Sequence, residues 1–383
     1  MKYHNLHIVS FTIPFPANYG GVIDVYYKLA ALNSIGIKVH LHCFQYDRQK
    51  APELERLCES VHYYPRKTGI TEQFSLTPFI VKGRRADELL RNLLLNDYPV
   101  LFEGLHSCYY LSHPLLKGRK LIYRESNIEH QYYYHLFKAE KRIVPKLFFL
   151  FESLRLFVFQ GSLKHASCML AVSEEDTKYL RIKFPGHNVV YLPSFHGNDR
   201  ISSMTGMGKY AFYHGNLSVA ENLQAVEFLI REVFSDLNIP LVIAGLNPPE
   251  HLKSLARKHS VEIHENVSAE AMDELLRNAH VNILVTFQST GLKLKLLNTL
   301  FKGRFVLVNP AMLAGTGLND YCVIAEDASG LRSELERIFR LPFDDSCLQA
   351  RNNLLSSNYS DSLNARVLAD ILYPFNPMGS EGY

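Results

Sequence analysis

The sequence predicts an α/β protein of two domains, each a doubly wound, Rossmann-like parallel sheet, facing each other across a cleft. Three observations lead to this prediction. The chain has 383 residues, the length of about two domains. Short apolar segments typical of strands alternate with segments of helical periodicity along most of it. A stretch rich in turn-forming residues, 196–208, separates two such runs.

The first run alternates strands and helices several times. Strand-like segments lie at 7–11, 38–44, 100–103, 120–123, 167–172 and 188–192. Helical periodicity covers 22–33, 87–96, 129–164 and 174–183. Ser173 precedes the last helix, and Asp176 stands where a capping box usually has Glu. This alternation predicts parallel pairing with right-handed crossovers.

The second run repeats the pattern. Strands are expected at 209–213, 240–244, 261–264, 281–285 and 305–309. Helices are expected at 222–234, 249–259, 269–278, 290–302, 331–339 and within 347–372. Gly303 follows the helix over 290–302 as a C′ glycine does. The expected domains are therefore 1–195 and 209–383, joined by the linker 196–208, and the last helix can return to the first domain.

Composition excludes several classes of protein. Hydrophobic residues make up 47% and charged residues 21%, which allows each domain a core and argues against disorder. The six cysteines are scattered without a CxxC pair, which argues against a disulfide framework or zinc ribbon and favours a reducing compartment. No apolar run reaches about 18 residues, so no spanning helix is expected.

The net charge of +3 hides an asymmetry between the two halves of the chain. The first 200 residues carry a net positive charge and the remainder a net negative charge. A basic first half favours an acidic partner such as an anionic lipid surface or a lipid phosphate, and a chance imbalance on a solvated surface is the alternative. The basic residues are dispersed and form no nucleic-acid-binding module, so nucleic acid is not an expected partner.

The loops that follow strands are the candidate binding segments, because ligands of doubly wound sheets bind at the carboxyl ends of strands. The first such loop ends in Gly20 and Gly21, where the backbone can approach a ligand and helix amides favour an anion. A tight turn is the alternative. Gly215 and Asn216 follow the first strand of the second run, and a helix cap is the alternative there.

The third loop opens the fourth helix of the second run. Thr290 can cap this helix and leave free amides near Gly291 and Leu292. A diphosphate bound there can also meet Lys293 or Lys295. The alternative is one solvated lysine on an otherwise buried helix.

Three further sets of residues admit two interpretations each. His40 and His42 share one face of a strand, so a metal pair is conceivable, although packing is the favoured interpretation. Glu103 and His106 follow a strand of the first domain and are candidates for acceptor contact, with a structural role as the alternative. The segment 144–163 is rich in Leu and Phe, which fits an amphipathic helix on a membrane surface or, preferably, core packing.

The order of these segments resembles retaining GT-B glycosyltransferases of the family-4 type. The resemblance spans about residues 5–340. In the second domain it rests on the segments "YHGNLSVAENLQAVEFL", "LVIAG", "ENVSAEAMDELLRNAHVNILV" and "STGLKLKLLNTLFKGRFVLVN". In the first domain, "YRESNIEHQYYY" is similar to the R-E-H-N-I-E stretch of many members.

The resemblance implies a nucleotide-sugar donor held mainly by the second domain, an acceptor against the first, and no metal or other cofactor. The implied donor-binding residues are Gly20, Gly21, Gly215, Asn216, Glu265, Val267, Gly291, Leu292 and Asn298. The expected catalytic residues, which stabilise the leaving diphosphate, are Thr290, Lys293 and Lys295. The expected acceptor-side residues are Glu103, His106, Ser126 and Asn127.

This chain departs from the pattern at several positions. Many relatives carry two Glu eight positions apart, and here those positions hold Thr290 and Asn298. Asn216 and Glu221 stand where many relatives have an Arg and a Lys, and Ser126 replaces the His of the first-domain stretch. The lysines after Thr290 are candidates for the missing positive charge.

The expected function is a retaining hexosyltransferase that moves a sugar to a glycan or lipid-linked acceptor in surface polysaccharide synthesis. A donor-binding or assembly protein that has lost catalysis is one alternative. A sugar-nucleotide epimerase is another, and it would need carboxylates and a His to move a proton. The expected location is the cytoplasm, with an anionic membrane as a peripheral contact at its inner face.

Overall fold

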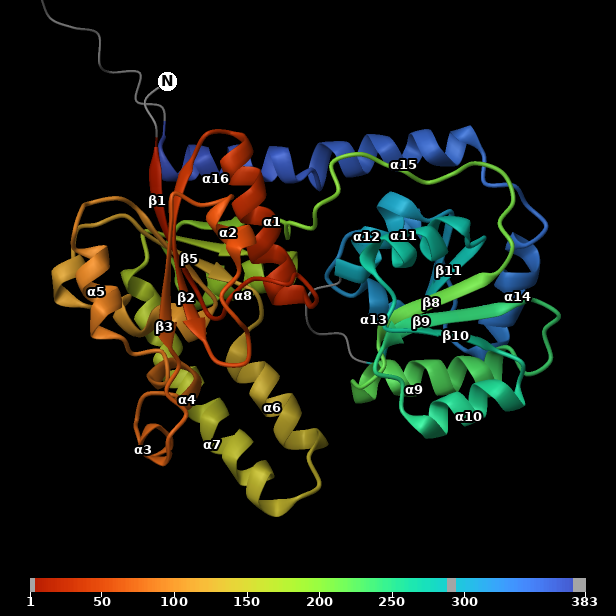
Figure 1. The fold of residues 1–383 in the computed structure, drawn as a ribbon, viewed down its shortest axis with the longest axis horizontal. Helices are drawn as coiled ribbons and strands as arrows, with labels where there is room; N and C mark the ends of the chain where they lie inside the picture. Colours follow the sequence, from red (N-terminus) through yellow and green to blue (C-terminus); the bar gives the residue numbers. More distant parts are fainter. Residues whose placement is uncertain (1–3, 288–293, 375–383) are drawn as a thin grey trace, which may run out of the picture. The chain divides into compact units, whose positions relative to one another are not determined.

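The computed structural model describes residues 4–287 and 294–374, and within them the chain forms two compact units. Unit 1 contains the residues up to Gly197 together with those from Asp361 onward, and unit 2 is Asn198–Ser360. The segment after Ser360, which the sequence analysis grouped with the second domain, thus belongs to unit 1 as its returning last helix. Figure 1 shows the elements of both units.

Unit 1 is built on a parallel sheet. Its strands are β1 Asn5–Ser10, β2 Lys38–Gln45, β3 Ser60–Pro65, β4 Val100–Glu103, β5 Leu121–Glu125, β6 Cys168–Ala171 and β7 Val189–Tyr191. Within the described residues the order is β3-β2-β1-β4-β5-β6-β7, and every pair is parallel. The predicted parallel sheet is therefore confirmed, and β3 is a strand that the sequence analysis did not identify.

The helices of unit 1 connect these strands and cover the sheet. They are α1 Gly20–Ser34, α2 Pro52–Glu55, α3 Ile70–Gln73, α4 Phe79–Lys82, α5 Asp87–Leu93, η1 Leu105–Tyr110, η2 Pro114–Leu116, α6 Glu129–Ala139, α7 Ile143–Phe159, η3 Gln160–His165, α8 Glu174–Lys183 and α16 Asp361–Leu372. The predicted cap of α8 is confirmed, because the Ser173 hydroxyl accepts a hydrogen bond from the Asp176 N–H at 3.0 Å.

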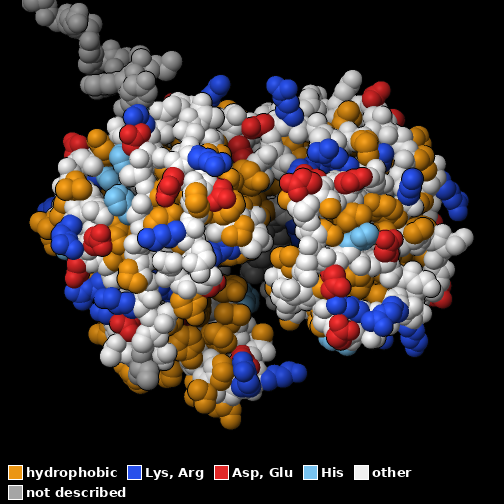
Figure 2. All heavy atoms as spheres, in the orientation of Figure 1, with side chains coloured by type: hydrophobic (Ala, Val, Ile, Leu, Met, Phe, Trp, Pro, Cys, Tyr) orange, Lys and Arg blue, Asp and Glu red, His pale blue; other side chains and the backbone are white. Residues whose placement is uncertain are grey.

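The helical stretch predicted over 129–164 is interrupted between α6 and α7. The Glu140 side chain accepts hydrogen bonds from the N–H groups of Lys141 at 3.0 Å and Arg142 at 2.9 Å, which holds a turn. Pro145 lies in the first turn of α7, where its missing N–H costs nothing, whereas the interior of one long helix would not tolerate it. Figure 2 shows hydrophobic side chains gathered at the surface over the region that Figure 1 labels α6 and α7.

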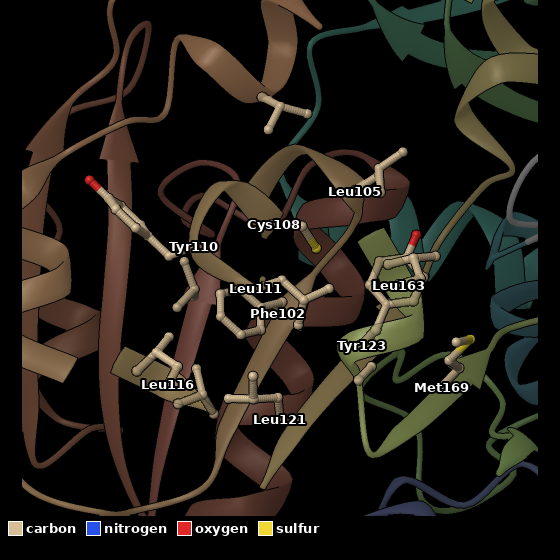
Figure 3. Close-up of a cluster of buried hydrophobic side chains, with 14 of the residues drawn as sticks. Phe102, Leu105, Cys108, Tyr110, Leu111, Leu116, Leu121, Tyr123, Leu163 and Met169 are labelled. Carbon is tan, nitrogen blue, oxygen red and sulfur yellow. The ribbon is translucent and has the colours of Figure 1, made fainter. Parts of the chain in front are cut away.

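Two hydrophobic clusters form the core of unit 1. Figure 3 shows part of the first, in which Phe102 of β4 and Leu111 lie together at the centre. The second contains buried residues of β1, β2 and α1 and is completed by Leu368 and Leu372 of α16. The last helix of the chain is therefore part of this core.

Unit 2 repeats the architecture. Its strands are β8 Ala211–Asn216, β9 Leu241–Leu246, β10 Glu262–Glu265, β11 Val281–Leu284, β12 Phe305–Val308 and β13 Val323–Ile324. Its helices are α9 Ala220–Phe228 with the π-helical turn η4 Leu229–Val233, α10 Glu250–Lys258, α11 Ala269–Asn278, α12 Leu294–Lys302, α13 Pro310–Leu313, η5 Asn319–Tyr321, α14 Ala328–Ile338 and α15 Asp345–Asn358. Over the described residues the order is β10-β9-β8-β11-β12-β13, again all parallel.

No helix within residues 4–287 and 294–374 is both long enough and apolar enough to span a membrane. All six cysteines are free thiols.

Candidate functional site

Each sheet has one place where the chain reverses the direction in which it adds strands. In unit 1 this switch point lies between β1 and β4, and in unit 2 it lies between β8 and β11. In doubly wound sheets in general, the loops after the two strands at such a point diverge to opposite faces, and ligands bind beside them at the carboxyl edge. The predicted site residues can therefore be sorted by their position relative to these two points.

In unit 2, the loop after β8 contains Gly215 and Asn216. The Asn216 Oδ1 atom accepts hydrogen bonds from the Ser218 N–H at 3.1 Å and from the Ser218 hydroxyl at 2.7 Å. The Asn222 side chain donates to the Asn216 carbonyl at 3.0 Å. In this structure Asn216 thus holds the turn into α9, which is the alternative role considered for it, and a contact with phosphate stays a prediction.

Lys295, in the first turn of α12, reaches the same edge of unit 2. Its Nζ atom donates to Asn222 Oδ1 at 3.3 Å and lies 5.4 Å from the centre of the Tyr213 ring. Tyr213 belongs to β8 and Asn222 to the first turn of α9, so an ammonium group stands beside the switch point. A cation at this place can stabilise negative charge on a bound anion.

A buried histidine lies beneath this lysine. His214 Nε2 is 3.2 Å from the Thr299 hydroxyl, which itself donates to the Lys295 carbonyl at 2.7 Å. Burial lowers the pKa of His214 to about 3, and Lys295 and Lys302 add to this effect. The imidazole is therefore neutral, and Lys295 is the cation at this position.

The other predicted residues of unit 2 are placed differently. Thr290, Gly291, Leu292 and Lys293 lie outside the described residues. Asn298 Oδ1 accepts a hydrogen bond from Asn198 Nδ2 at 3.1 Å.

Glu265 is the last residue of β10 and Val267 follows it, and this strand is separated from β8 by β9. Glu265 forms a surface ion pair with Lys253 at 2.7 Å, and Val267 packs against the cluster around Phe212. The structure thus does not bring these two residues together with Lys295.

A contact that the sequence analysis missed joins both sides of the unit 2 switch point. The Thr286 hydroxyl, just after β11, donates to the Glu221 carboxylate in the first turn of α9. The Asn309 side chain holds the backbone of Thr286 in place. Its Oδ1 atom accepts a hydrogen bond from the Thr286 N–H at 3.1 Å, and its Nδ2 atom donates one to the Thr286 carbonyl at 2.6 Å. The sequence contains one signal for this contact. Glu221 stands at a position where many relatives have a cation.

In unit 1, Gly21 and Gly104 allow a close approach around the Phe11 ring. A Cβ atom on Gly21 would lie 2.8 Å from Phe11 Cζ, and Gly104 has a φ of +68° with its missing Cβ 3.2 Å from His106 Nδ1 and 3.8 Å from Ser126 Oγ. The structure therefore brings Gly21, His106 and Ser126 together at the switch point, with Gly20 next along α1.

A titratable cluster adjoins them. His106 Nδ1 lies 3.7 Å from Glu129 Oε1, and the Arg84 Nε atom donates to the Phe11 carbonyl at 2.6 Å. Burial raises the pKa of Glu129 to about 8 although Arg84 opposes the shift, and burial with the charges of Arg84 and Arg66 holds the pKa of His106 well below its usual range. Near neutral pH the cluster therefore offers a protonated carboxyl group and a neutral imidazole.

Two buried polar atoms of this cluster have no hydrogen-bond partner among the described residues, His106 Nδ1 and Glu125 Oε2. The other oxygen of Glu125 accepts from the Asn127 N–H at 3.3 Å. Such atoms are costly to bury unless a ligand or water satisfies them. The sequence analysis missed Glu129 and Arg84, and Glu129 could have been found as the last residue of the "YRESNIE" segment.

Glu103 faces the interior. It is only 2% exposed, and its carboxylate accepts from Lys28 Nζ at 2.7 Å. Lys28 also pairs with Asp24 at 3.0 Å, and Arg124 pairs with the other oxygen of Asp24 at 3.2 Å. This buried network ties α1 to β4 and β5 beneath the switch point and leaves Glu103 no open face toward an acceptor.

A hollow of about 580 Å³ lies beside the loops that follow β1 and β2. Its lining includes Phe15, Asn18, Arg48 and Lys50. Arg48 Nη1 donates to the Pro16 carbonyl at 2.7 Å, which holds the two loops together. The hollow thus places cationic side chains, Arg48 and Lys50, beside acidic ones, Asp47 and Glu53, at the carboxyl edge of unit 1.

His40 and His42 do not form a metal pair. His42 Nε2 is 2.8 Å from His7 Nδ1, and His42 Nδ1 is 2.8 Å from the Tyr64 hydroxyl, so both ring nitrogens are engaged. No cluster of three or more His, Cys, Asp or Glu suited to a metal occurs in the described part of the chain. The packing interpretation of these histidines therefore fits the structure.

No model of a known protein family matches the sequence. A relative from Klebsiella pneumoniae, described as an uncharacterized 44.6 kDa protein in the cps region, is 27% identical over 349 residues that cover 84% of this chain and 87% of that protein.

Solved glycosyltransferase structures match nearly the whole chain. Sucrose-phosphate synthase from Thermosynechococcus elongatus is 13% identical, with 96% of each chain covered and a TM-score of 0.64. HepE from Anabaena, solved with UDP and glucose, is 10% identical, with 97% and 100% covered and a TM-score of 0.64. WaaG, described as a glycosyltransferase involved in lipopolysaccharide biosynthesis, is 12% identical, with 97% and 100% covered and a TM-score of 0.63.

The chain has the GT-B fold. Unit 1 provides the first Rossmann-like domain of this GT-B architecture, and unit 2 provides the second. The fold class predicted from the alternation of strands and helices is thereby confirmed.

Proposed function

We propose that the protein is a retaining glycosyltransferase that moves a hexosyl group from a nucleotide sugar to a glycan or lipid-linked acceptor. The observation that carries this proposal is the likeness of both units together, over at least 96% of the chain, to structures of glycosyltransferases. We further propose a role in surface polysaccharide synthesis in the cytoplasm, which is supported by the cps region of the Klebsiella relative.

In this proposal the donor diphosphate binds at the switch point of unit 2. Lys295 and the backbone amides at the start of the helix that contains it stabilise the negative charge, and no metal ion takes part. The bond between the anomeric carbon and the diphosphate oxygen breaks, and a bond from that carbon to the acceptor oxygen forms. The acceptor hydroxyl proton passes to the leaving diphosphate on the same face of the sugar, so the protein supplies positioning and charge stabilisation without its own nucleophile.

Unit 1 supplies groups suited to sugar hydroxyls. A protonated Glu129 donates a hydrogen bond, and the neutral His106 can accept or donate one. Ser126 and Asn127 lie within the same segment of chain. These groups carry no net charge near neutral pH, which suits a neutral polyhydroxylated ligand.

The decisive test measures donor binding and turnover in the same preparation. A panel of nucleotide sugars is screened by thermal shift, and each one that raises the melting temperature is assayed for nucleotide release and glycoside formation. Lys295→Ala is expected to lower turnover by about 100-fold or more, because a charge contact to the leaving group is worth about 3 kcal/mol, with little change in melting temperature. Lys258→Ala, an exposed lysine at the end of α10, is the matched control and is expected to retain activity.

Other outcomes of these assays would favour one of the alternative functions. Donor binding without hydrolysis or transfer would favour a donor-binding or assembly protein, in keeping with Thr290 and Asn298 at the positions of the Glu pair. Release of free nucleotide without a glycoside would favour a sugar-nucleotide epimerase. Equal turnover and stability in Lys295→Ala and wild type would reject the role of this lysine.

A further inference from the structure

Helix α7 exposes a continuous apolar stripe. It consists of Ile143, Val144, Leu147, Phe151, Leu154 and Val158, all exposed. Ile143, Val144 and Val158 are 74%, 78% and 76% exposed, far more than core packing would leave. At about 100° per residue these positions fall within an arc of about 100° on one side of the helix.

The opposite side of α7 is the one that packs on unit 1. Glu152, Ser153 and Leu156 are its buried residues. Glu152 accepts from the Ile80 N–H at 3.3 Å, and the Ser153 hydroxyl donates to the His130 carbonyl at 2.7 Å. The helix is therefore anchored through these buried residues, and its apolar stripe is left without a partner among the described residues of unit 1. The core-packing interpretation favoured for 144–163 is thus wrong for these exposed residues, whereas Leu156 and Leu163 do belong to the core of unit 1.

The charges around the apolar stripe are mainly positive. The exposed or half-buried cations of α6, α7 and the turn between them are Lys138, Lys141, Arg142, Lys146 and Arg155. Among the acidic side chains of this hairpin, Glu129 and Glu152 are buried, and Glu140 pairs with Arg142 at 2.9 Å. The hairpin thus presents apolar and cationic groups together.

The cations lie beside aromatic rings at the apolar border. Lys138 Nζ lies 4.6 Å from the centre of the Tyr134 ring, and Lys146 Nζ lies 5.3 Å from that of Phe137. Tyr132 and Tyr134 of α6 are also exposed. Tyrosines and long cationic side chains at the border of an apolar surface are typical of helices that lie at the headgroup level of a bilayer.

We propose that the apolar stripe of α7 docks the protein on the surface of an anionic lipid bilayer, with the helix lying in the interface and the surrounding Lys and Arg side chains at the lipid phosphates. This inference concerns residues of unit 1 other than those assigned to the candidate site, and it goes beyond the proposed function. Attraction of the cations to anionic headgroups adds to burial of the apolar side chains, so binding depends on both lipid charge and ionic strength.

Charge also decides between a bilayer and a second copy of the chain. A two-fold contact through the apolar stripe brings the same surface of both copies together. The partner surface would then carry the same excess of cations, Lys141, Arg142 and Lys146 among them, with Glu140 as the acidic side chain nearest to them in sequence. An anionic surface neutralises these charges, whereas a second copy repeats them.

The test uses the full chain and vesicles without donor or acceptor. Co-sedimentation is measured with phosphatidylcholine vesicles and with phosphatidylcholine vesicles containing phosphatidylglycerol, at low and high salt. The wild type is expected to bind the vesicles that contain phosphatidylglycerol and to be released by salt. Val144→Asp/Phe151→Asp is expected to weaken this binding at least tenfold, and Lys141→Glu/Lys146→Glu to weaken it without affecting the residual binding to phosphatidylcholine.

Matched controls separate docking from loss of fold. Leu95→Asp/Ile182→Asp replaces two other exposed apolar residues of unit 1 and is expected to bind as the wild type does. Melting temperatures of all variants are compared, and the exposed positions are expected to leave them unchanged within a few degrees.

The proposal would be overturned if the wild type did not bind vesicles that contain phosphatidylglycerol. It would also be overturned if Val144→Asp/Phe151→Asp and Lys141→Glu/Lys146→Glu bound these vesicles as well as the wild type does. A wild-type dimer that the α7 substitutions convert to a monomer, with vesicle binding unaltered, would assign the stripe to a second copy instead. Because no sugar transfer is measured, loss of vesicle binding leaves the proposed function intact, and an inactive protein that still binds vesicles rejects only the function.

Discussion

A chain of buried hydrogen bonds in unit 1 allows one arrangement of protons. Asn96 Oδ1 accepts only, so the His7 Nε2 atom 2.8 Å away carries a proton, and His7 Nδ1 then accepts from His42 Nε2. His42 Nδ1 in turn accepts from the Tyr64 hydroxyl, whose oxygen accepts from the Asn92 side chain at 2.8 Å. Every member is satisfied only while both imidazoles are neutral.

This series of hydrogen bonds predicts that the folded protein loses stability in acid. Burial lowers the pKa of His7 to about 4 and that of His42 well below 6.5. Between about pH 6.5 and pH 4 the unfolded chain binds protons at these residues and the folded chain does not, so stability falls as the pH falls through that window. We expect the melting temperature to drop from about pH 7.5 to pH 5.

The comparison is with His7→Leu/His42→Leu. This variant is expected to melt lower at every pH, because Tyr64 and Asn96 lose partners, but with a flatter dependence on pH. Parallel curves for the variant and the wild type would show that these histidines are not responsible.

Sequence reasoning reached some site residues and not others for physical reasons. Gly21 and Lys295 follow strands or open helices, and local patterns reveal such positions. Arg84 lies in the turn after α4, far along the chain from Phe11, and only the folded contact with the Phe11 carbonyl reveals its place at the carboxyl edge. Glu103 ends β4 at the expected edge of the sheet, but its carboxylate is buried and accepts a hydrogen bond from Lys28 of α1, a contact that the local sequence does not reveal.

The sequence predicted whether a segment forms a helix or a strand more accurately than it predicted whether that segment is buried or exposed. The alternation of segments identified most strands within a residue or two, and the bounds of α8 and α11 agree with the prediction. The composition of 144–163 could not distinguish a buried helix from one at the surface, because both are rich in Leu and Phe. The surroundings of a helix are decided by tertiary packing, and its own sequence does not contain them.

Gly303 also shows that the sequence of an element does not reveal its tertiary contacts. Gly303 was expected to end α12 in a left-handed conformation, but it is not among the described residues with positive φ. Its missing Cβ would instead lie 2.3 Å from Asn282 Nδ2, so glycine is required there by a neighbour on β11. The sequence correctly predicted that α12 ends just before Gly303. The predicted reason for a glycine at this position was wrong.

A second close approach yields a prediction for β8 and β9. A Cβ atom on Gly245 would lie 2.0 Å from the Gly215 carbonyl oxygen, so Gly245→Ala forces the ends of these strands apart. We expect a loss of about 1–3 kcal/mol in the free energy of unfolding and weaker binding of any ligand at the unit 2 switch point. Urea unfolding measures the first effect, and Gly161→Ala, whose added Cβ has open space, is the control. Unchanged stability of Gly245→Ala would contradict this account.

At the scale of the whole molecule, unit 1 is discontinuous in sequence. Asp361 accepts hydrogen bonds from the N–H groups of His196 at 3.1 Å and Gly197 at 2.7 Å, which joins the two crossings between the units. Ala365, Leu368 and Leu372 of α16 then complete a core built from β1, β2 and α1. Residues far apart in the chain therefore share one folding unit.

Leu368→Ala tests this dependence. The side chain is fully buried, so its truncation is expected to cost about 2–5 kcal/mol in the unfolding of unit 1. Arg366→Ala, an exposed neighbour on the same helix, is expected to change stability by less than about 0.5 kcal/mol. Calorimetry of the full chain measures both, and a Leu368→Ala variant as stable as Arg366→Ala would show that α16 is dispensable to the core.

The return of α16 sets an order of events during synthesis on the ribosome. Unit 2 is one uninterrupted stretch, Asn198–Ser360, and can mature as soon as it leaves the exit tunnel. The N-terminal portion emerges earlier but must wait, with an apolar groove open to chaperones, until the final helix has been translated. Of the two units, the one whose synthesis starts earlier is thus the one completed later.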